Sequence, residues 1–430
     1  MTNSIAAGTL IERIRFSPRY LMWAIMAVYA LIEFYPVNYG VSTVAFFGVT
    51  TFCLAWLLAF PGTKLINKAN FEVLIFFAFW LAYSLFSYIW AIDRDLALEN
   101  SLLIFRYLGV FVIFDALFRD HRILRRAHLV MAGILVLYIL TALWEMLTFQ
   151  HLPSSRYYGM PFYYVPTGPF YNQNNLAAFM IFIMPCLLFL PKLYRHAWLK
   201  LAVAGATLLI LVIITVQGAR IAMLAAGAML LAVGLLNSSV KTKLITVLVI
   251  LLAVMAFFRY APPGMKLGWK LVQREIESFG TEAESAHMSS LKIRRQLVDR
   301  DYRSHMREAL LWGLGVGTSS IIWITDREYR TAGITNAHNW FLEILGNYGI
   351  LILAAFVYIY LRWLWLLWLR YKASEGRERN LNLAYLWVLL MFIPASALPS
   401  SIRWNHHIWI IFAAINAVCN SERLLLKETK

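Results

Sequence analysis

Charged residues are scarce in this sequence of 430 residues. Asp, Glu, Lys and Arg make up 14% of it and hydrophobic residues 61%, whereas a soluble domain carries roughly 25% charged residues. Apolar runs of about 18 to 24 residues recur along the chain and are long enough to cross the hydrocarbon core of a bilayer. The composition therefore argues against a soluble protein and predicts an all-α polytopic membrane protein.

Cysteine is scarce as well, and several motifs of well-known enzymes are missing. Cys53, Cys186 and Cys419 all lie within apolar runs, so we expect small buried side chains, with neither a disulfide framework nor a CxxC metal spacing. The sequence has no GxxxxGK[ST] loop and no HExxH pair. These absences leave an ATP-driven reaction unsupported.

The apolar runs predict about twelve transmembrane helices. Their expected ranges are 20–36, 40–60, 71–90, 101–118, 128–149, 174–191, 198–216, 219–236, 243–260, 338–368, 381–398 and 405–424. The first run follows three arginines and precedes no small-residue cleavage site, which indicates an uncleaved helix rather than a signal peptide. The run at 338–368 is too long for one crossing, so we expect it to be broken or to begin outside the bilayer.

Positive charge is concentrated in alternate connections. The basic ones contain Lys64 and Lys68; Arg119, Arg122, Arg125 and Arg126; Lys192, Arg195 and Lys200; Lys241 and Lys243; and Arg370, Lys372, Arg377 and Arg379. Basic connections stay in the cytoplasm, which predicts both termini inside and the loops at 150–173 and 261–336 outside. Much of the net charge of +16 is thus a topology signal rather than evidence of a nucleic-acid partner.

We interpret residues 1–430 as a single integral membrane domain. The long loop at 261–336 is the one polar interruption, and apolar residues at three- and four-residue multiples predict an amphipathic helix within it, from about 286 to 312. Gly313, Gly315 and Gly317 mark a turn after that helix.

Two residues at helix starts are catalytic candidates. Arg220 lies in a Gln-Gly-Ala-Arg turn between two apolar helices, where it needs a partner or a water-filled cavity and could clamp a phosphate at two points. The alternative is an arginine that extends to the interface. His338 opens the tenth helix and could accept a proton from a hydroxyl, although a capping or interfacial histidine is the alternative.

Further candidates for substrate binding precede the sixth helix. Asn172, Asn174 and Asn175 lie beside a cluster of tyrosines, and amides with amphipathic aromatic rings suit sugar binding. Arg156 is an isolated cation in the same connection. A helix cap with an interfacial aromatic belt is the alternative interpretation.

The long loop contains a basic cluster that includes Arg294, Arg295 and Arg307. It could bind an anionic head group or a diphosphate, and a solvated helix face is the alternative. The Asp93-Arg94-Asp95 and Asp299-Arg300-Asp301 stretches resemble metal-binding acidic pairs, but the enclosed arginine opposes a cation, so ion-pair or cap roles are favoured. His406 and His407 lack further ligands. We therefore expect no metal site.

The order of these motifs resembles the bacterial O-antigen ligase/polymerase superfamily, and the ligase branch best. A GPFxNxNNLA-like segment at 168–177 is followed by the Gly-Ala-Arg turn at 218–220, a long outer loop with arginines and glycines, and His-Asn-x-x-Leu at 338–342. The resemblance is clearest over residues 165–350.

The resemblance implies a glycosyltransferase in the bacterial inner membrane whose active site faces the periplasm. Such ligases transfer O-antigen polysaccharide from undecaprenyl diphosphate to lipid A–core oligosaccharide, with inversion and without metal or cofactor. It implies that Arg220 and a loop arginine, best matched by Arg295, bind the diphosphate. His338 would accept the proton of the acceptor hydroxyl, or orient that hydroxyl, and Asn339 would help to hold the substrates. Membrane lipids would surround the protein.

Three rivals remain at this point. An O-antigen polymerase, or another ligase of lipid-linked glycans, uses the same donor with another acceptor. A small-anion transporter predicts internal repeats and paired broken helices, and Arg106 inside the fourth helix is its best support. A membrane scaffold predicts no clustering of Arg, His and Asn on one side.

Overall fold

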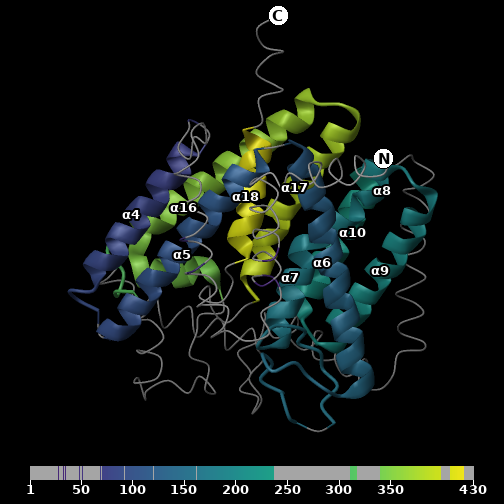
Figure 1. Ribbon diagram of the computed structural model, residues 1–430, viewed down its shortest axis with the longest axis horizontal. Coiled ribbons are helices and arrows are strands. Elements are labelled where there is room, and N and C mark those ends of the chain that lie inside the picture. The colour runs from purple at the N-terminus through teal and green to yellow at the C-terminus, as the bar shows by residue number, and fades with distance from the viewer. Residues whose placement is uncertain are drawn as a thin grey trace, which may run out of the picture.

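The computed structural model describes residues 70–236, 310–316, 339–398 and 407–420, apart from positions 92, 120 and 161, together with six isolated positions (28, 32, 34, 48, 51 and 68). Within these residues the regular structure is helical and there is no strand (Figure 1). The helices predicted at 20–36, 40–60 and 243–260, and most of the loop at 261–336 with its amphipathic helix, lie outside the described residues or are represented only at isolated positions.

Ten helices are described: α4 (Phe71–Ser87), α5 (Arg94–Phe118), α6 (His121–Thr148), α7 (Gln173–Leu188), α8 (Leu190–Tyr194), α9 (Ala197–Val216), α10 (Arg220–Leu236), α16 (Trp340–Ala373), α17 (Gly376–Ser396) and α18 (Ile408–Cys419). Five spans are long and apolar enough to cross a membrane, and α4, α10 and α18 are shorter apolar helices. The described part is that of a polytopic membrane protein; the count of twelve stays a prediction.

Three helices begin well before the apolar runs predicted, and one of them is α17, which starts at Gly376 rather than at 381. The run at 101–118 belongs to a helix that starts at Arg94, and the run at 128–149 to one that starts at His121. In α5, the side chain of Asp93 accepts a hydrogen bond from the backbone N–H of Leu96 at 2.9 Å. This cap stabilises a polar first turn that hydropathy alone does not detect, and it confirms a capping role for Asp93.

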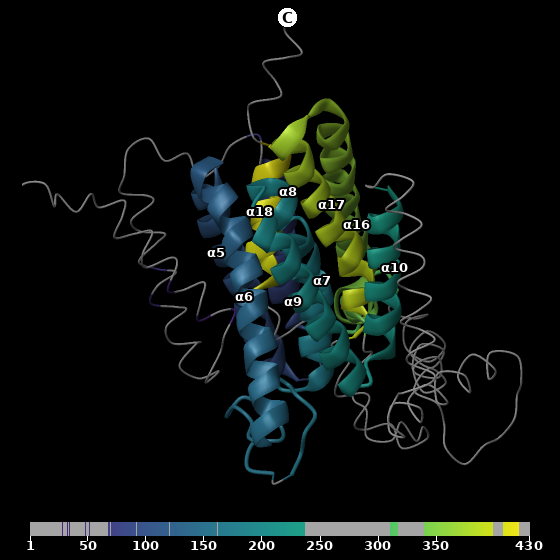
Figure 2. The ribbon, with the colours of Figure 1, turned by 90° about the vertical axis from the view of Figure 1, so that its right-hand side faces the viewer.

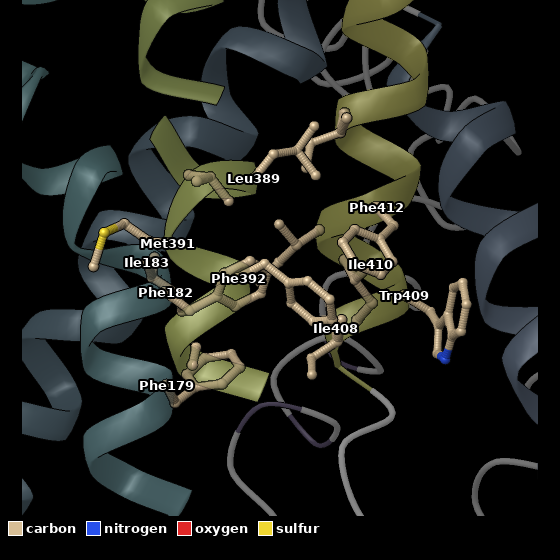
Figure 3. Close-up of a cluster of buried hydrophobic side chains, with 14 of the residues drawn as sticks. Phe179, Phe182, Ile183, Leu389, Met391, Phe392, Ile408, Trp409, Ile410 and Phe412 are labelled. Carbon is tan, nitrogen blue, oxygen red and sulfur yellow. The ribbon is translucent and has the colours of Figure 1, made fainter. Parts of the chain in front are cut away.

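The central contacts are made by α7, α16, α17 and α18. The ring of Phe392 in α17 lies 5.6 Å from Phe182 of α7, 4.8 Å from Trp340 of α16 and 5.2 Å from Phe412 of α18. Figure 3 shows Phe392 between Phe182 and Phe412. Aromatic pairs at such distances contribute about 0.5–1.5 kcal/mol each beyond the area they bury. Helix contacts in a bilayer depend on such packing, because lipid is as apolar as the side chains.

The helices have two distinguishable ends. One end, here called the loop end, contains the connection from Phe149 to Asn172 and the starts of α7, α10, α16 and α18; it is the lower end in Figures 1 and 2. The described basic connections around Arg119, Lys192 and Arg370–Arg379 lie at the opposite end. These three basic connections therefore share one end of the described helices, and the membrane topology, including which end faces the cytoplasm, stays a prediction.

A buried carboxylate joins three helices at the opposite end. Asp115 of α5 is 2% exposed and accepts hydrogen bonds from the side chains of Asn70 at 3.0 Å, Asn416 at 2.7 Å and Arg119 at 2.8 Å. A buried carboxylate is stable only when such donors replace its water. This network ties the start of α4 to the ends of α5 and α18.

The long helix predicted at 338–368 is broken, as its length had indicated. Gly349, with φ 76° and ψ −178°, interrupts α16 in a region that is essentially restricted to glycine. An unbroken helix would carry a hydrogen bond from Ile350 N–H to Gly346 C=O. Instead, Ile350 N–H donates to Leu310 C=O at 2.9 Å, and Leu314 N–H donates to Gly346 C=O at 2.8 Å. A described part of the long loop thus satisfies both groups that the break releases, each of which would cost several kcal/mol unpaired in lipid.

Candidate functional site

The connection from Phe149 to Asn172 is fixed at the loop end by Glu145, near the end of α6. This carboxylate is fully buried and accepts hydrogen bonds from the backbone N–H groups of Thr167 and Gly168, both at 2.7 Å. His151 lies 3.2 Å from it through Nδ1, while its Nε2 lies 2.9 Å from the carbonyl oxygen of Tyr163. The imidazole thus bridges two oxygen atoms. These hydrogen bonds hold the connection in a defined fold at the end of α6.

A second tie joins this connection to the turn that contains Arg220. The side-chain Nε2 of Gln217 donates to the carbonyl oxygen of Pro166 at 2.9 Å. Gly218 adopts φ 66°, which lets the chain reverse between α9 and α10, and Arg220 is the first residue of α10. This hydrogen bond therefore links the residue just before the Gly218–Arg220 turn to a residue just before the Gly168–Asn175 segment, 51 positions away in sequence.

The three asparagines lie at the start of α7. The side chain of Asn172 caps the helix by accepting a hydrogen bond from the N–H of Asn175 at 3.0 Å, which confirms the capping interpretation for this residue. Asn174 is partly buried. The Oδ1 of Asn175 is buried and has no hydrogen-bond partner among the described residues. A buried acceptor of this kind calls for a donor such as water or a hydroxyl group.

Arg156 lies beside this helix start. Its backbone N–H donates to Tyr171 C=O at 3.0 Å, its guanidinium lies 4.6 Å from the ring centroid of Tyr157, and a guanidinium nitrogen donates to the hydroxyl of Tyr157. A further contact of 3.4 Å reaches the side-chain oxygen of Gln173. Arg156 therefore lies beside the asparagine segment, and its role in substrate binding stays a prediction.

Aromatic rings give the connection both an ordered interior and an exposed face. Tyr157 and Tyr163 stack with their centroids 3.8 Å apart. The pKa of Tyr163 is raised to about 12, mainly by burial and to a lesser extent by the hydrogen bond to Tyr157, so its hydroxyl stays protonated at neutral pH. Other large side chains point outward: Tyr158, Phe162, Tyr164 and Tyr171 are exposed. Exposed rings with hydroxyl groups suit stacking on sugars.

Asn339 lies at the start of another helix. Its side chain accepts a hydrogen bond from the N–H of Leu342 at 3.2 Å and caps α16. The next residue, Trp340, is buried and packs against Phe392, which also contacts Phe182 of α7. The helices that start at Asn172 and Asn339 are thus both packed on α17 at the loop end.

His338, Arg294, Arg295 and Arg307 lie outside the described residues, so their placement stays a prediction. His407 was considered above as a possible metal ligand. His407 is buried, begins α18 and packs edge-on against Phe179 at 4.1 Å. In the part of the chain that the structure describes, no group of three or more His, Cys, Asp or Glu residues is placed to hold a metal ion.

Sequence reasoning missed Glu145, His151 and Gln217. A carboxylate near the end of an apolar helix is itself a signal, because such a residue needs a partner in the membrane. Its partners are backbone N–H groups more than 20 residues away, which no local pattern identifies.

Two comparisons with known proteins bear on the family of this chain. The family described as O-Antigen ligase matches residues 205–357, which include Gln217, Arg220 and the first part of α16. The teichuronic acid biosynthesis protein TuaE of Bacillus subtilis (strain 168) is 25% identical over 362 residues, covering 81% of this chain and 71% of the relative. With the motif order of residues 168–342, these matches support the O-antigen ligase superfamily as the family that this chain resembles.

Proposed function

We propose that the protein is an O-antigen ligase, which transfers O-antigen polysaccharide from undecaprenyl diphosphate to lipid A–core oligosaccharide at the periplasmic face of the inner membrane. The family match and the relative support the broader part of this activity, which is the ligation or polymerisation of lipid-linked glycans. The observation that carries the proposal is the Gln217–Pro166 hydrogen bond, because it joins the amide segment to the arginine turn.

The reaction needs two things from the protein. The acceptor hydroxyl attacks the anomeric carbon of the donor, the bond from that carbon to the diphosphate oxygen breaks, and the diphosphate leaves with the electron pair. Cationic groups are needed to stabilise the charge that develops on the diphosphate, and a base must take the hydroxyl proton. Attack from the face opposite the leaving group inverts the anomeric centre.

The candidate residues can be given roles on this scheme. Arg220 and Arg295 bind the diphosphate, assisted by Arg294 and Arg307 of the same loop as Arg295. Planar guanidinium groups can bind a phosphate at two points. His338 takes the proton or orients the acceptor hydroxyl. Fixed arginines would do the work that a metal ion does in other glycosyltransferases.

The asparagine segment is assigned to the sugars. The buried Oδ1 of Asn175 offers an acceptor for a sugar hydroxyl, Asn174 and Arg156 lie at the same helix start, and exposed tyrosines flank them. The side chains of Asn172 and Asn339 cap their helices, so these two residues act by fixing the helix starts.

The acceptor separates the proposal from its nearest rival. TuaE is named for teichuronic acid biosynthesis, so the superfamily does not by itself fix lipid A–core as the acceptor. A polymerase would use the same donor and extend the polysaccharide on its carrier. The His338-Asn339 pair after a long loop favours the ligase.

Two observations favour a transporter. Arg106 is buried inside α5, where a charge can mark a pathway, and α16 is broken at Gly349. A transporter built from repeats would show a matching break in a second helix. Among the described helices, Gly349 of α16 is the one interior residue with non-helical backbone angles, which favours the glycan chemistry.

Deletion of the gene in its own host tests the proposal through the banding pattern of lipopolysaccharide. A ligase predicts loss of every capped species while polymer accumulates on the lipid carrier, and restoration by the wild-type gene. A single capped repeat would mean a polymerase instead. An unchanged pattern would contradict both.

A further inference from the structure

The break in α16 and the segment Leu310–Val316 form one structural unit, here called the α16 latch. In it, two backbone hydrogen bonds through the inserted segment replace the single helical bond between Ile350 and Gly346. The segment is anchored further by Val316, whose side chain is fully buried and whose N–H donates to the Ser87 hydroxyl at 3.3 Å. The long loop is thereby attached to α4 as well as to α16.

The latch depends on two glycines that touch through their backbones. A Cβ atom on Gly313, which has φ +68°, would lie 2.6 Å from both Asn347 O and Gly349 N. A Cβ atom on Gly349 would collide with the carbonyl oxygen of Leu311. Backbone atoms cannot yield as a flexible side chain can, so no other residue fits at either position.

The latch sets the direction of the first segment of α16, Trp340–Tyr348. If the inserted segment leaves, Ile350 N–H and Gly346 C=O can bond to each other again, and the helix can continue straight. The docked state keeps Tyr348 against Trp80, with ring centroids 5.4 Å apart, and Trp340 against Phe392 at 4.8 Å. These two contacts fix both ends of the segment that Asn339 caps.

We propose that Gly313 and Gly349 are positioning residues: by holding the α16 latch closed, they fix the start of α16 at Asn339, the residue that follows the candidate base His338 in sequence, for the transfer reaction. The inference rests on the proposed function for its consequence on activity. The docking of Leu310–Val316 on α16 can be tested separately, by a measurement that does not depend on enzymatic activity.

The test replaces Gly349 by Ala and measures two properties. The first is labelling of a Val316→Cys variant by a membrane-impermeant maleimide. The second is ligation at equal protein level, with kcat and the KM for the lipid-linked donor determined separately. We expect Gly349→Ala to expose position 316 to labelling and to lower kcat at least tenfold with little change in KM. Gly313→Ala should behave in the same way.

Matched controls come from two other glycines. Gly376 has φ +58° and Gly227 lies inside α10, and a Cβ atom at either would meet nothing within 4 Å. Gly376→Ala therefore reproduces the backbone strain without the collision, and both variants should leave position 316 protected and kcat within about twofold of the parent. Ser87→Ala, which removes only the hydroxyl that holds Val316, is the milder variant if Gly349→Ala fails to fold; partial labelling is expected.

Protection of position 316 in both Gly349→Ala and Ser87→Ala would overturn the latch. Labelling with an unchanged kcat would overturn its positioning role. If the proposed function alone is wrong, the labelling results will stand and no ligation will be measured for the parent protein.

Discussion

Gln217 and Pro166 join two separate parts of the chain through a single hydrogen bond of 2.9 Å, donated by the side-chain amide to the backbone carbonyl oxygen. Pro166 belongs to the connection that Glu145 anchors, and Gln217 immediately precedes the turn that leads to Arg220. Arg220 and the asparagines at the start of α7 are therefore expected to act as one site, and this relationship can be tested directly.

Replacement of Gln217 by Met should reduce ligation about tenfold at equal protein level. Met has a similar length and no donor, so the Pro166 carbonyl loses its partner, and a buried unpaired acceptor costs about 1–3 kcal/mol. A loss of 1.4 kcal/mol in transition-state stabilisation corresponds to about tenfold in rate. Ligation of carrier-bound polysaccharide in isolated membranes measures the effect.

Gln150→Met is the control, because Gln150 is exposed in the same connection. It should keep the parental rate. Equal activity of Gln217→Met and the parent would show that the tie does not matter for the reaction.

Glu145→Gln should destabilise the protein and detach the connection. A carboxylate accepts the two backbone N–H groups and faces His151, whereas an amide would direct its NH₂ group toward one of these donors. Removal of one partner from a buried charged network costs about 3–5 kcal/mol. A lower unfolding temperature of the purified protein in detergent, with faster proteolysis between Phe149 and Asn172, is expected.

Glu375→Gln provides the comparison, since Glu375 is exposed and its side chain makes no capping hydrogen bond at α17. An unfolding temperature for Glu145→Gln equal to that of Glu375→Gln would remove the anchoring role of Glu145.

The apolar runs predicted the helices well and their ends less well. Hydropathy located the span that becomes α5 but missed residues 94–100, because Arg94, Asp95 and Glu99 are charged; the first turn is stabilised by the Asp93 cap. The excess length of 338–368 indicated a broken helix. The position of the break, however, is set by Leu310–Gly313, which lies 36 residues before Gly349 at its closest point and pairs with α16 only in the folded chain.

In the candidate site, too, the sequence indicated the residues but not the long-range contacts that hold them. The motif order singled out Asn172, Asn174, Asn175 and Arg220, and Arg156 was a candidate as an isolated cation of the same connection. The structure places these residues at one end of the bundle. The ties that hold them together were not predictable, because Glu145–Gly168 and Gln217–Pro166 are contacts between segments 23 and 51 residues apart. Periodicity reports on local structure, and such contacts leave no periodic signal.

Arg220→Lys distinguishes two-point phosphate binding from charge alone. Lysine keeps the positive charge and loses the planar fork of donors, so we expect a fall of at least tenfold in kcat/KM for the lipid-linked donor. Arg220→Ala should fall further. Measurement of kcat/KM over a range of donor concentrations provides the comparison, and full activity of the lysine variant would contradict two-point binding.

His338→Ala should lower kcat by about 10² to 10⁴, the range that a general base contributes. His196→Ala is the matched control: His196 is exposed before α9, at the opposite end of the bundle, and should be dispensable. Ligation by both variants is compared at equal protein level. A rate for His338→Ala within twofold of that for His196→Ala would exclude the catalytic role.

Reconstitution tests the central claim most directly. The purified protein is incorporated into liposomes with polysaccharide on undecaprenyl diphosphate and with lipid A–core, without ATP, and the products are separated by mass. The ligase account predicts polysaccharide joined to lipid A–core and one undecaprenyl diphosphate released for each chain transferred. Growth of the carrier-bound polysaccharide with unmodified lipid A–core, or no transfer at all, would contradict it.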